Sequence, residues 1–243
     1  GVQLLPPCEA GRAWAAAAAR AAQAVLADRQ MQARWLRHGG TWFVGVDALP
    51  NGPDGAVAGV PLPEAWRAAA GWDGAWHRAQ VSAVWPGYPR QDPGESAAAH
   101  RFRRDRDGAH VDGLLPRGAD KRRYLEEAHA FVLGIGLDDG PGAPLVVWEG
   151  SHRVIGAAFA EAIGPRVPDA VDLTEVYRAA RARVLESCQR RSVRLTLGGA
   201  VLLDRRLVHG IASWPEDAAG GQGGPRVMAY FRPQLADPRD WLR

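Results

Sequence analysis

Residues 192–214 read SVRLTLGGAVLLDRRLVHGIASW and contain three short apolar runs, at 192–197, 200–203 and 207–214. A glycine pair separates the first two runs, and a charged triplet separates the last two. Short apolar runs bounded by glycine or charged residues are typical of strands joined by tight turns. This stretch therefore predicts β structure.

Similar short runs flank this stretch on both sides. They lie at residues 41–46, 79–85, 98–103, 128–137, 144–148 and 226–232. Many short strands separated by glycine, proline and aspartate favour a sandwich, a barrel or a jelly roll over a doubly wound α/β sheet. The glycine-rich residues 218–224 predict a loop before the last strand. We therefore expect a mainly β fold.

Helices are predicted at three places. Residues 8–37 are strong helix formers with apolar side chains three and four positions apart, and a short helix is expected at 63–70. Asp172 followed by Glu175 three residues later is a helix-capping pattern, and an apolar stripe follows it. A third helix is therefore predicted near 172–190.

The chain shows no composition change that would mark a linker between independent domains. We expect a single domain over residues 1–243, in which residues 1–75 form a helical N-terminal support. Residues 76–243 form the β core with the helix near 172–190 as an insertion.

Composition excludes several classes of protein. Of the 243 residues, 47% are hydrophobic and 23% are charged, which is ordinary for a globular fold and excludes disorder. The net charge is only +3, and Lys121 is the single lysine, so a nucleic-acid partner does not follow from the high pI. The sequence leaves the oligomeric state open.

Cysteine usage and hydropathy bear on the compartment. Cys8 and Cys188 lie far apart with no C-x-x-C spacing, which argues against a zinc knuckle or a disulfide framework and favours a reducing cytosol. The alanine-rich residues 13–27 are interrupted by Arg20, so they do not resemble a signal peptide or a membrane span. We expect a cytoplasmic protein that is not embedded in a membrane.

Three side chains form a candidate metal site. His110 and Asp112 are two positions apart, which on an extended strand places both side chains on one face. The pattern is weak alone, but His209 ends a second apolar run. Two histidines and one carboxylate on a β scaffold are the set that holds Fe(II) and leaves other coordination positions open.

Arg226 extends this candidate site. It follows His209 by seventeen positions and lies on the next predicted strand. A keto acid can chelate the iron through its carboxylate and keto oxygens, O2 can take the remaining position, and an arginine can bind the distal carboxylate through two parallel hydrogen bonds.

The motifs around these residues resemble the Fe(II)/2-oxoglutarate dioxygenases, and within them the phytanoyl-CoA dioxygenase-like branch. The resemblance covers roughly residues 76–233. It is carried by AHVDG at 109–113, LDDG at 137–140, WEGSHR at 148–153, LDRRLVH at 203–209 and PRVMAYF at 225–231. The Gly-Ser-His block is specific to that branch, although Trp148-Glu149 departs from the residues usual before it.

The resemblance implies a fold, a reaction and a set of roles. The fold would be a double-stranded β-helix, a cupin-like jelly roll, supported by N-terminal helices. His110, Asp112 and His209 would ligate Fe(II), and Arg226 would bind the C5 carboxylate of the cosubstrate 2-oxoglutarate. With O2, the enzyme would oxidise a small organic substrate, most simply by hydroxylation, and release succinate and CO2.

Several residues near these motifs are left with open roles. Arg232 shares a strand face with Arg226, so only the motif favours Arg226 for 2-oxoglutarate. Ser151 and His152 are interpreted as hydrogen bonding within a turn, with His152 outside the metal site. Other candidates for contact with substrate or cosubstrate are Arg101, Arg103 and the basic run 121–123.

Two alternatives remain at this stage, besides a halogenase, which the carboxylate at Asp112 disfavours. The first is a non-catalytic cupin-like protein that binds a metal or ligand. The second is an AlkB-like nucleic-acid demethylase, because Arg226 and Arg232 reproduce an Arg-x5-Arg spacing found there. The near absence of lysine and the Gly-Ser-His block disfavour the demethylase.

Overall fold

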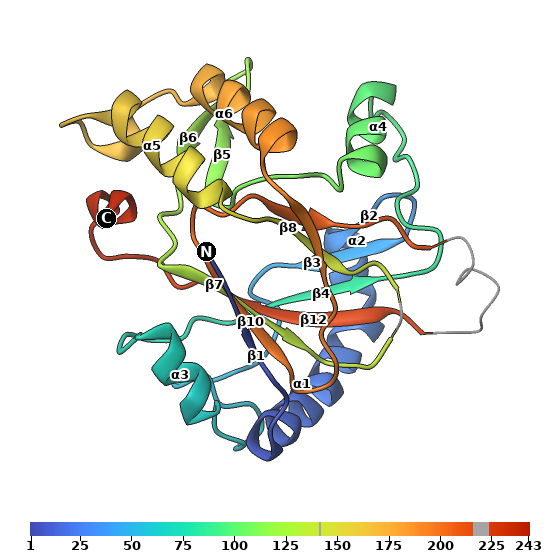
Figure 1. The fold of residues 1–243 in the computed structure, drawn as a ribbon. Coiled ribbons are helices and arrows are strands. Elements are labelled where there is room, and N and C mark those ends of the chain that lie inside the picture. The colour runs from blue at the N-terminus through green and yellow to red at the C-terminus, as the bar shows by residue number, and fades with distance from the viewer. Residues whose placement is uncertain (141, 216–223) are drawn as a thin grey trace.

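The computed structural model describes residues 1–140, 142–215 and 224–243 (Figure 1). The predicted loop at 218–224 lies, apart from its last residue, outside the described residues. In chain order the elements are β1 (Val2–Leu5), α1 (Glu9–Ala27), α2 (Arg29–Trp35), β2 (Leu36–Arg37), β3 (Trp42–Gly45), α3 (Glu64–Ala70), β4 (Gln80–Val84), α4 (Ala97–Asp105), β5 (Leu114–Arg117), β6 (Arg122–Leu125), β7 (Phe131–Gly136), β8 (Leu145–Trp148), α5 (Ser151–Ile163), the 3-10 helix η1 (Pro168–Ala170), α6 (Thr174–Ser187), β9 (Arg190–Val193), β10 (Ala200–Asp204), β11 (His209–Ile211), β12 (Arg226–Phe231) and the 3-10 helix η2 (Pro238–Leu242).

Two antiparallel sheets form the core. The larger has the order β1-β10-β7-β12-β4-β3-β2, and the smaller has the order β11-β8-β9. A bridge between His110 and His209 adds the segment around His110 to the free side of β11. Strands β5 and β6 form a separate hairpin.

The connectivity identifies the fold. Taken in chain order, β4, the His110 segment and β7 to β12 make eight successive segments. The first, eighth, third and sixth lie side by side in the larger sheet, and the second, seventh, fourth and fifth lie side by side in the smaller one. This is a double-stranded β-helix, so the predicted mainly β jelly roll is confirmed.

Apolar side chains fill the space between the two sheets, and helices cover the outer faces. The inner layer includes Val132, Leu145, Val147, Leu203 and Tyr230. On the outer face of the larger sheet, α1 packs through its buried alanines and Trp14, whose indole N–H donates to the carbonyl of Gly55 at 2.9 Å. The predicted N-terminal helical support is therefore present.

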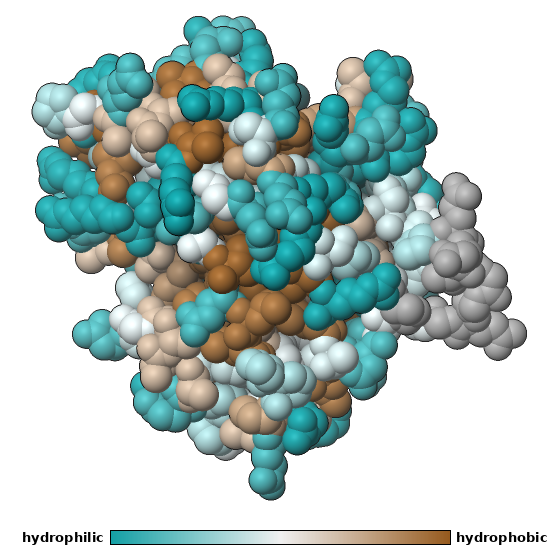
Figure 2. All heavy atoms as spheres, viewed as in Figure 1, coloured by the Kyte–Doolittle hydropathy of each residue, from teal (hydrophilic) through white to brown (hydrophobic). Residues whose placement is uncertain are grey.

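The helical pair α5 and α6 covers the smaller sheet at the opposite end of the molecule from α1 and α3 (Figure 1). The face drawn in Figure 2 gathers hydrophobic residues near its centre, over the strands, with hydrophilic residues around them. Over the described residues, no helix is both long enough and apolar enough to span a bilayer. Cys8 and Cys188 are free thiols.

The predicted helix at 8–37 is two helices. Asp28 ends α1 and begins α2, and its carboxylate accepts hydrogen bonds from the backbone N–H groups of Gln30, at 2.7 Å, and Met31, at 3.1 Å. An aspartate that satisfies the free N–H groups of a first turn is a strong N-cap, so the chain restarts a helix there.

The predicted strand at 98–103 is wrong, because residues 97–105 form α4. The Ser96 hydroxyl caps this helix by accepting from the N–H of Ala99 at 3.2 Å, and three alanines fill its first turn. The alternation of arginine around Phe102 suggested a strand, but alanine has the highest helix propensity. Arg101 and Arg103 consequently lie on a helix and do not share a strand face.

The helical insertion is larger than predicted. Helix α6 occupies most of 172–190, but α5 precedes it and was not expected. The predicted cap by Asp172 is wrong: Leu173 is the N-cap of α6 and the helix has no side-chain cap. Asp172 accepts from the N–H of Thr174 at 3.0 Å, and Glu175 pairs with Arg178.

Candidate active site

The two predicted histidine ligands meet through the backbone. The N–H of His110 donates to the carbonyl of His209, and the N–H of His209 donates to the carbonyl of His110, each at 2.9 Å. Two residues that exchange both hydrogen bonds in this way are directly opposite in an antiparallel pair. The fold thus holds two residues 99 positions apart in one fixed register.

Asp112 completes a compact cluster with these histidines. Its Oδ1 lies 3.3 Å from Nε2 of His110, and its Oδ2 lies 3.7 Å from Nε2 of His209. One ligand atom from each of the three residues lies within 4.8 Å of the others. The structure therefore brings together the three residues that the sequence singled out, and their spacing suits one shared metal ion.

Hydrogen bonds orient both imidazoles toward this centre. Nδ1 of His110 faces the carbonyl of Gly108, and Nδ1 of His209 faces the carbonyl of Leu207, each at 3.0 Å. A carbonyl can only accept, so Nδ1 carries the proton and Nε2 presents its lone pair. Metal-binding histidines are oriented in this manner by backbone carbonyls.

The electrostatics also suit a metal ion. Burial lowers the pKa of His209 to about 4, so its imidazole is neutral at pH 7. Burial by itself would raise the pKa of Asp112, but Arg232 and the two histidines outweigh it and hold that pKa well below its usual range. Two neutral imidazoles and one ionised carboxylate are the protonation states that a divalent metal requires.

Glycines follow the ligands because the chain is crowded there. Gly113, directly after Asp112, has φ +83°, and a Cβ on it would lie 2.1 Å from the carbonyl oxygen of Glu127. Gly210, directly after His209, would place a Cβ 2.2 Å from the carbonyl oxygen of Asp107. Both glycines of the AHVDG and VHG motifs thus have a steric reason.

Ser151 supports the second histidine. Its hydroxyl is fully buried and accepts from the N–H of Val208 at 2.9 Å, next to His209. The predicted hydrogen bonding within a turn is therefore wrong for Ser151, which begins α5 and binds the residue directly before β11. His152 is the next residue of α5 and is not a member of the metal-ligand cluster.

A cavity of about 120 Å³ opens onto the cluster. Its lining includes all three candidate ligands together with Trp42, Val44, Gln80, Val132, Leu145, Gly210, Ile211, Tyr230 and Arg232. A larger groove of about 750 Å³ runs between α5 and α6, but it contains none of these residues. The chemistry of the ligands, more than volume, therefore selects the smaller cavity as the candidate active site.

Arg226 is buried on β12, and its guanidinium forms no ion pair within contact distance among the described residues, although the carboxyl of Asp138 is close enough to interact with it electrostatically. Its side chain is on the strand face shared with Met228 and Tyr230, which pack between the sheets. All three guanidinium nitrogens are buried without a hydrogen-bond partner in residues 1–140, 142–215 and 224–243. Burial raises the pKa of Tyr230, and the nearby guanidinium of Arg226 opposes that shift.

Arg232 has a different environment from Arg226. Its Nη1 lies 3.5 Å from Oδ2 of Asp112, and its Nη2 donates to Oε1 of Gln80 at 2.8 Å. Arg232 directly follows β12, lines the cavity at the metal cluster and is already engaged with Asp112, whereas Arg226 is not among the residues that line this cavity. Arg226 is the one left to bind an anion.

The remaining basic candidates lie elsewhere or have partners. Arg122 pairs with Asp172, and the guanidinium of Arg123 donates to the carbonyl of Leu114. Lys121 is exposed in the turn between β5 and β6. None of the three lines the cavity at the metal cluster, so the basic run contributes no contact there.

Sequence reasoning missed the residues that line the cavity without carrying a motif. Trp42 and Gln80 belong to segments far in sequence from the candidate ligands. Trp42 and Gln80 are opposite Val84 and Tyr230 in neighbouring strands. Only the pairing of β4 with β3 and β12 places them at the site, and no local pattern indicates that pairing.

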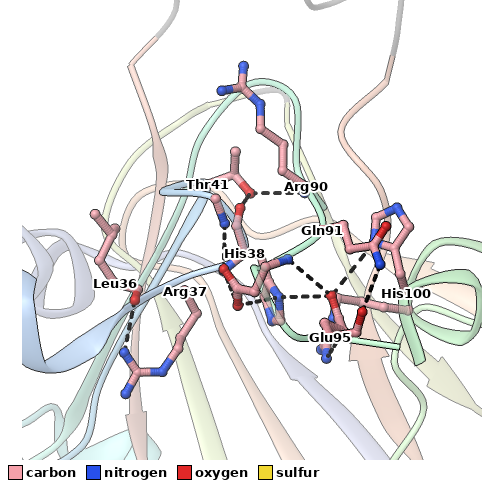
Figure 3. A network of polar contacts seen from close by, with 11 residues as sticks. Leu36, Arg37, His38, Thr41, Arg90, Gln91, Glu95 and His100 are labelled. Carbon is pink, nitrogen blue, oxygen red and sulfur yellow. Dashed lines mark hydrogen bonds and ion pairs between the residues drawn. The ribbon is translucent and has the colours of Figure 1, made fainter. Parts of the chain in front are cut away.

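A buried histidine network lies beside this cavity (Figure 3). His38 stacks on Trp42, with ring centroids 5.5 Å apart, and its Nδ1 is 3.3 Å from Asp92 and 4.0 Å from Glu95. Burial lowers the pKa of His38 to about 4, with Arg103 acting in the same direction and both carboxylates opposing it. His38 is therefore neutral in the folded protein at pH 7.

This histidine predicts acid sensitivity. Between pH 6.5 and about 4, His38 binds a proton in the unfolded chain but not in the folded protein. As the pH falls through this range, His38 should therefore lower the free energy of unfolding by up to about 1.4 kcal/mol per pH unit. His38→Asn cannot titrate and tolerates the positive φ of 54° at this position. Urea unfolding at pH 7 and pH 5 should show a smaller loss of stability in the variant, and equal losses would contradict the assignment.

Comparison with known proteins gives structural neighbours only. No family model matches the chain, and no curated protein sequence matches it. Among solved structures, AviO1 from Streptomyces viridochromogenes Tue57 is similar over 98% of this chain and 91% of its own, with a TM-score of 0.48 and 17% identity. The non-heme alpha ketoglutarate dependent carbocyclase SnoK from nogalamycin biosynthesis is similar over 97% and 83%, with a TM-score of 0.46 and 15% identity.

EctD from S. alaskensis, in its apoform, is similar over 95% of this chain and 71% of its own, with a TM-score of 0.45 and 18% identity. All three of these TM-scores are below 0.5.

Proposed function

We propose that this protein is an Fe(II)- and 2-oxoglutarate-dependent oxygenase that oxidises a small organic substrate and releases succinate and CO2. The observation that carries the proposal is the pairing of two features in one jelly roll. One is the cluster of His110, Asp112 and His209, and the other is the buried, unpaired guanidinium of Arg226. The first suits Fe(II), and the second suits the distal carboxylate of a keto acid.

The residues present fit both groups. His110 and His209 offer Nε2 lone pairs, and Asp112 offers an ionised carboxylate, so these three would hold the iron. Bound there with a keto acid, iron supplies the activation of O2 that protein side chains cannot perform. Arg226 would bind the C5 carboxylate, and Arg232 would keep Asp112 in place through its contact with Oδ2.

The apolar walls contribute to the same chemistry. Val132 and Leu145 line the cavity, and so does Tyr230 of β12, the strand that also carries Arg226. Such apolar walls lower the local dielectric, which strengthens charge interactions made inside this cavity of about 120 Å³. The protein's part is to orient the cosubstrate, balance its charge and keep the centre dry.

Arg226 also separates this proposal from a non-catalytic cupin-like protein. A purely structural metal site needs no buried cation nearby, and an unpaired buried guanidinium costs several kcal/mol of stability unless a ligand compensates it. That a nucleic-acid substrate is unlikely, and that the protein is cytoplasmic, stay predictions from sequence.

The proposal is tested without knowing the substrate. Fe(II) and 2-oxoglutarate are added to the apo protein without oxygen, and the visible spectrum is recorded. We expect a weak metal-to-ligand charge-transfer band, because a keto acid chelated to Fe(II) requires two adjacent open positions beside the three protein ligands. Admitting O2 should bleach the band slowly and form succinate through uncoupled turnover.

The control for this experiment is succinate in place of 2-oxoglutarate. It carries the same carboxylates but no keto group, so it should give no band. Protein shown to hold iron but giving no band with 2-oxoglutarate would contradict the oxygenase and favour the metal-binding cupin.

A further inference from the structure

A second cavity, of about 240 Å³, adjoins the metal cluster. It is lined by Trp42, Tyr88, Arg103, Asp107, Gly108, His110 and Ile211. Three of these residues, Trp42, His110 and Ile211, also line the cavity at the cluster. A molecule in this second cavity would therefore contact the candidate metal ligand His110, whose side chain is 46% exposed.

Arg103 of α4 supplies the polar wall. Its Nη2 is 3.1 Å from Oε1 of Glu95, and its Nε is buried without a partner among the described residues. Its Nη1 lies against Gly108, since a Cβ on Gly108 would be 3.6 Å from that nitrogen. Gly108 is two residues before His110, so the guanidinium reaches the same rim as the metal cluster.

Arg103 can still donate to a carboxylate although Glu95 balances its charge, because its contact with Glu95 is through Nη2 and Nε is buried without a hydrogen-bond partner among the described residues. The ionisable carboxylate in the cavity lining is Asp107, and both of its oxygens accept from Arg190 at 2.7 Å. Asp107 is thereby neutralised. Burial raises the pKa of Tyr88, so its hydroxyl stays protonated and is a neutral hydrogen-bonding group beside Arg103.

Glu95 and its neighbours fix the position of Arg103. His38, Glu95 and His100 point toward one another in Figure 3, and Nδ1 of His100 is 3.8 Å from Glu95. The network also holds Trp42, on which His38 stacks. One buried polar network thus orients both the cationic wall and the aromatic wall of the cavity, which is how recognition sites are made rigid.

We infer that this second cavity is the substrate subsite, and that Arg103 binds a carboxylate of an organic acid whose apolar body lies against Trp42 and Ile211. The inference rests on the proposed function, because it takes the occupant to be the molecule oxidised beside His110. Arg103 is then a specificity-determining residue, and Arg101, exposed on the same helix, is not.

The test compares acids with their amides, which have nearly the same shape but no charge. Binding of phenylacetate, phenylacetamide, hexanoate and hexanamide to the protein is measured by calorimetry without iron or 2-oxoglutarate. We expect at least one acid to bind about tenfold or more tightly than its amide. Arg103→Gln should abolish that preference, Arg103→Lys should keep part of it, and the matched control Arg101→Gln should leave it unchanged.

Several outcomes would overturn the inference. They are equal binding of acid and amide, no binding of either acid at millimolar concentration, or a preference that survives Arg103→Gln in protein of unchanged melting temperature. A loss of 2-oxoglutarate affinity in Arg103→Gln would instead assign this arginine to the cosubstrate. Because calorimetry is done without iron, the two hypotheses are tested separately. The acid preference can be absent while the charge-transfer band forms, which would overturn only the subsite. The band can be absent while the acid preference is present, which would overturn only the proposed function.

Discussion

Replacing His110, Asp112 or His209 by alanine is expected to abolish stoichiometric Fe(II) binding while the protein stays folded. Each residue supplies one of three ligand atoms that lie within 4.8 Å of one another. The loss should exceed the roughly 10- to 100-fold decrease in affinity that follows removal of a group hydrogen-bonded to a ligand. Bound iron is measured after anaerobic gel filtration.

The fold should survive because the side chains of the candidate ligands are not needed for the backbone pairing of the strands that carry them. The hydrogen bonds between residues 110 and 209 are made by main-chain atoms, and the core between the sheets is apolar. Melting temperatures should therefore shift by only a few degrees, at roughly 2–4 °C per kcal/mol for a chain of this size. His152→Ala is the matched control and should keep its iron; full iron occupancy in any ligand variant would remove that residue from the site.

The candidate ligand set could be predicted because its residues belong to short sequence motifs. His110 and Asp112 are two residues apart, and a crowded turn explains the glycine that follows Asp112. The short apolar runs around His209 and the turn residues between them were enough to predict a jelly roll. What the sequence could not supply was the register that places His110 opposite His209, since no local pattern encodes a pairing across 99 residues.

Other features escaped prediction for identifiable reasons. Residues 98–103 have an alternating pattern, yet capping by Ser96 and the alanines of the first turn make a helix. Arg103 consequently comes to the second cavity from a helix and not from a strand. The choice between Arg226 and Arg232 was also undecidable from parity, because it depends on which side chain Asp112 engages.

That choice leads to the second large effect: Arg226→Ala should weaken 2-oxoglutarate binding by about tenfold to more than a hundredfold and leave Fe(II) affinity nearly unchanged. A buried carboxylate without its guanidinium loses a charge-assisted hydrogen bond worth about 1.5–3 kcal/mol. Arg226→Lys should recover only part, because an ammonium cannot make the two parallel hydrogen bonds. Affinity is read from titration of the charge-transfer band in iron-loaded protein without oxygen.

Arg232→Ala should give the opposite pattern, with weaker iron binding and a smaller change in 2-oxoglutarate affinity, because its guanidinium contacts Asp112. A thermal readout separates the two arginines independently of the spectrum. The same concentration of 2-oxoglutarate should raise the melting temperature of the wild type and of Arg232→Ala clearly more than that of Arg226→Ala, since stabilisation by a ligand falls as its dissociation constant rises. If Arg232→Ala lost the larger share of 2-oxoglutarate affinity, the distal carboxylate would belong to Arg232, and the unpaired guanidinium of Arg226 would need another anion.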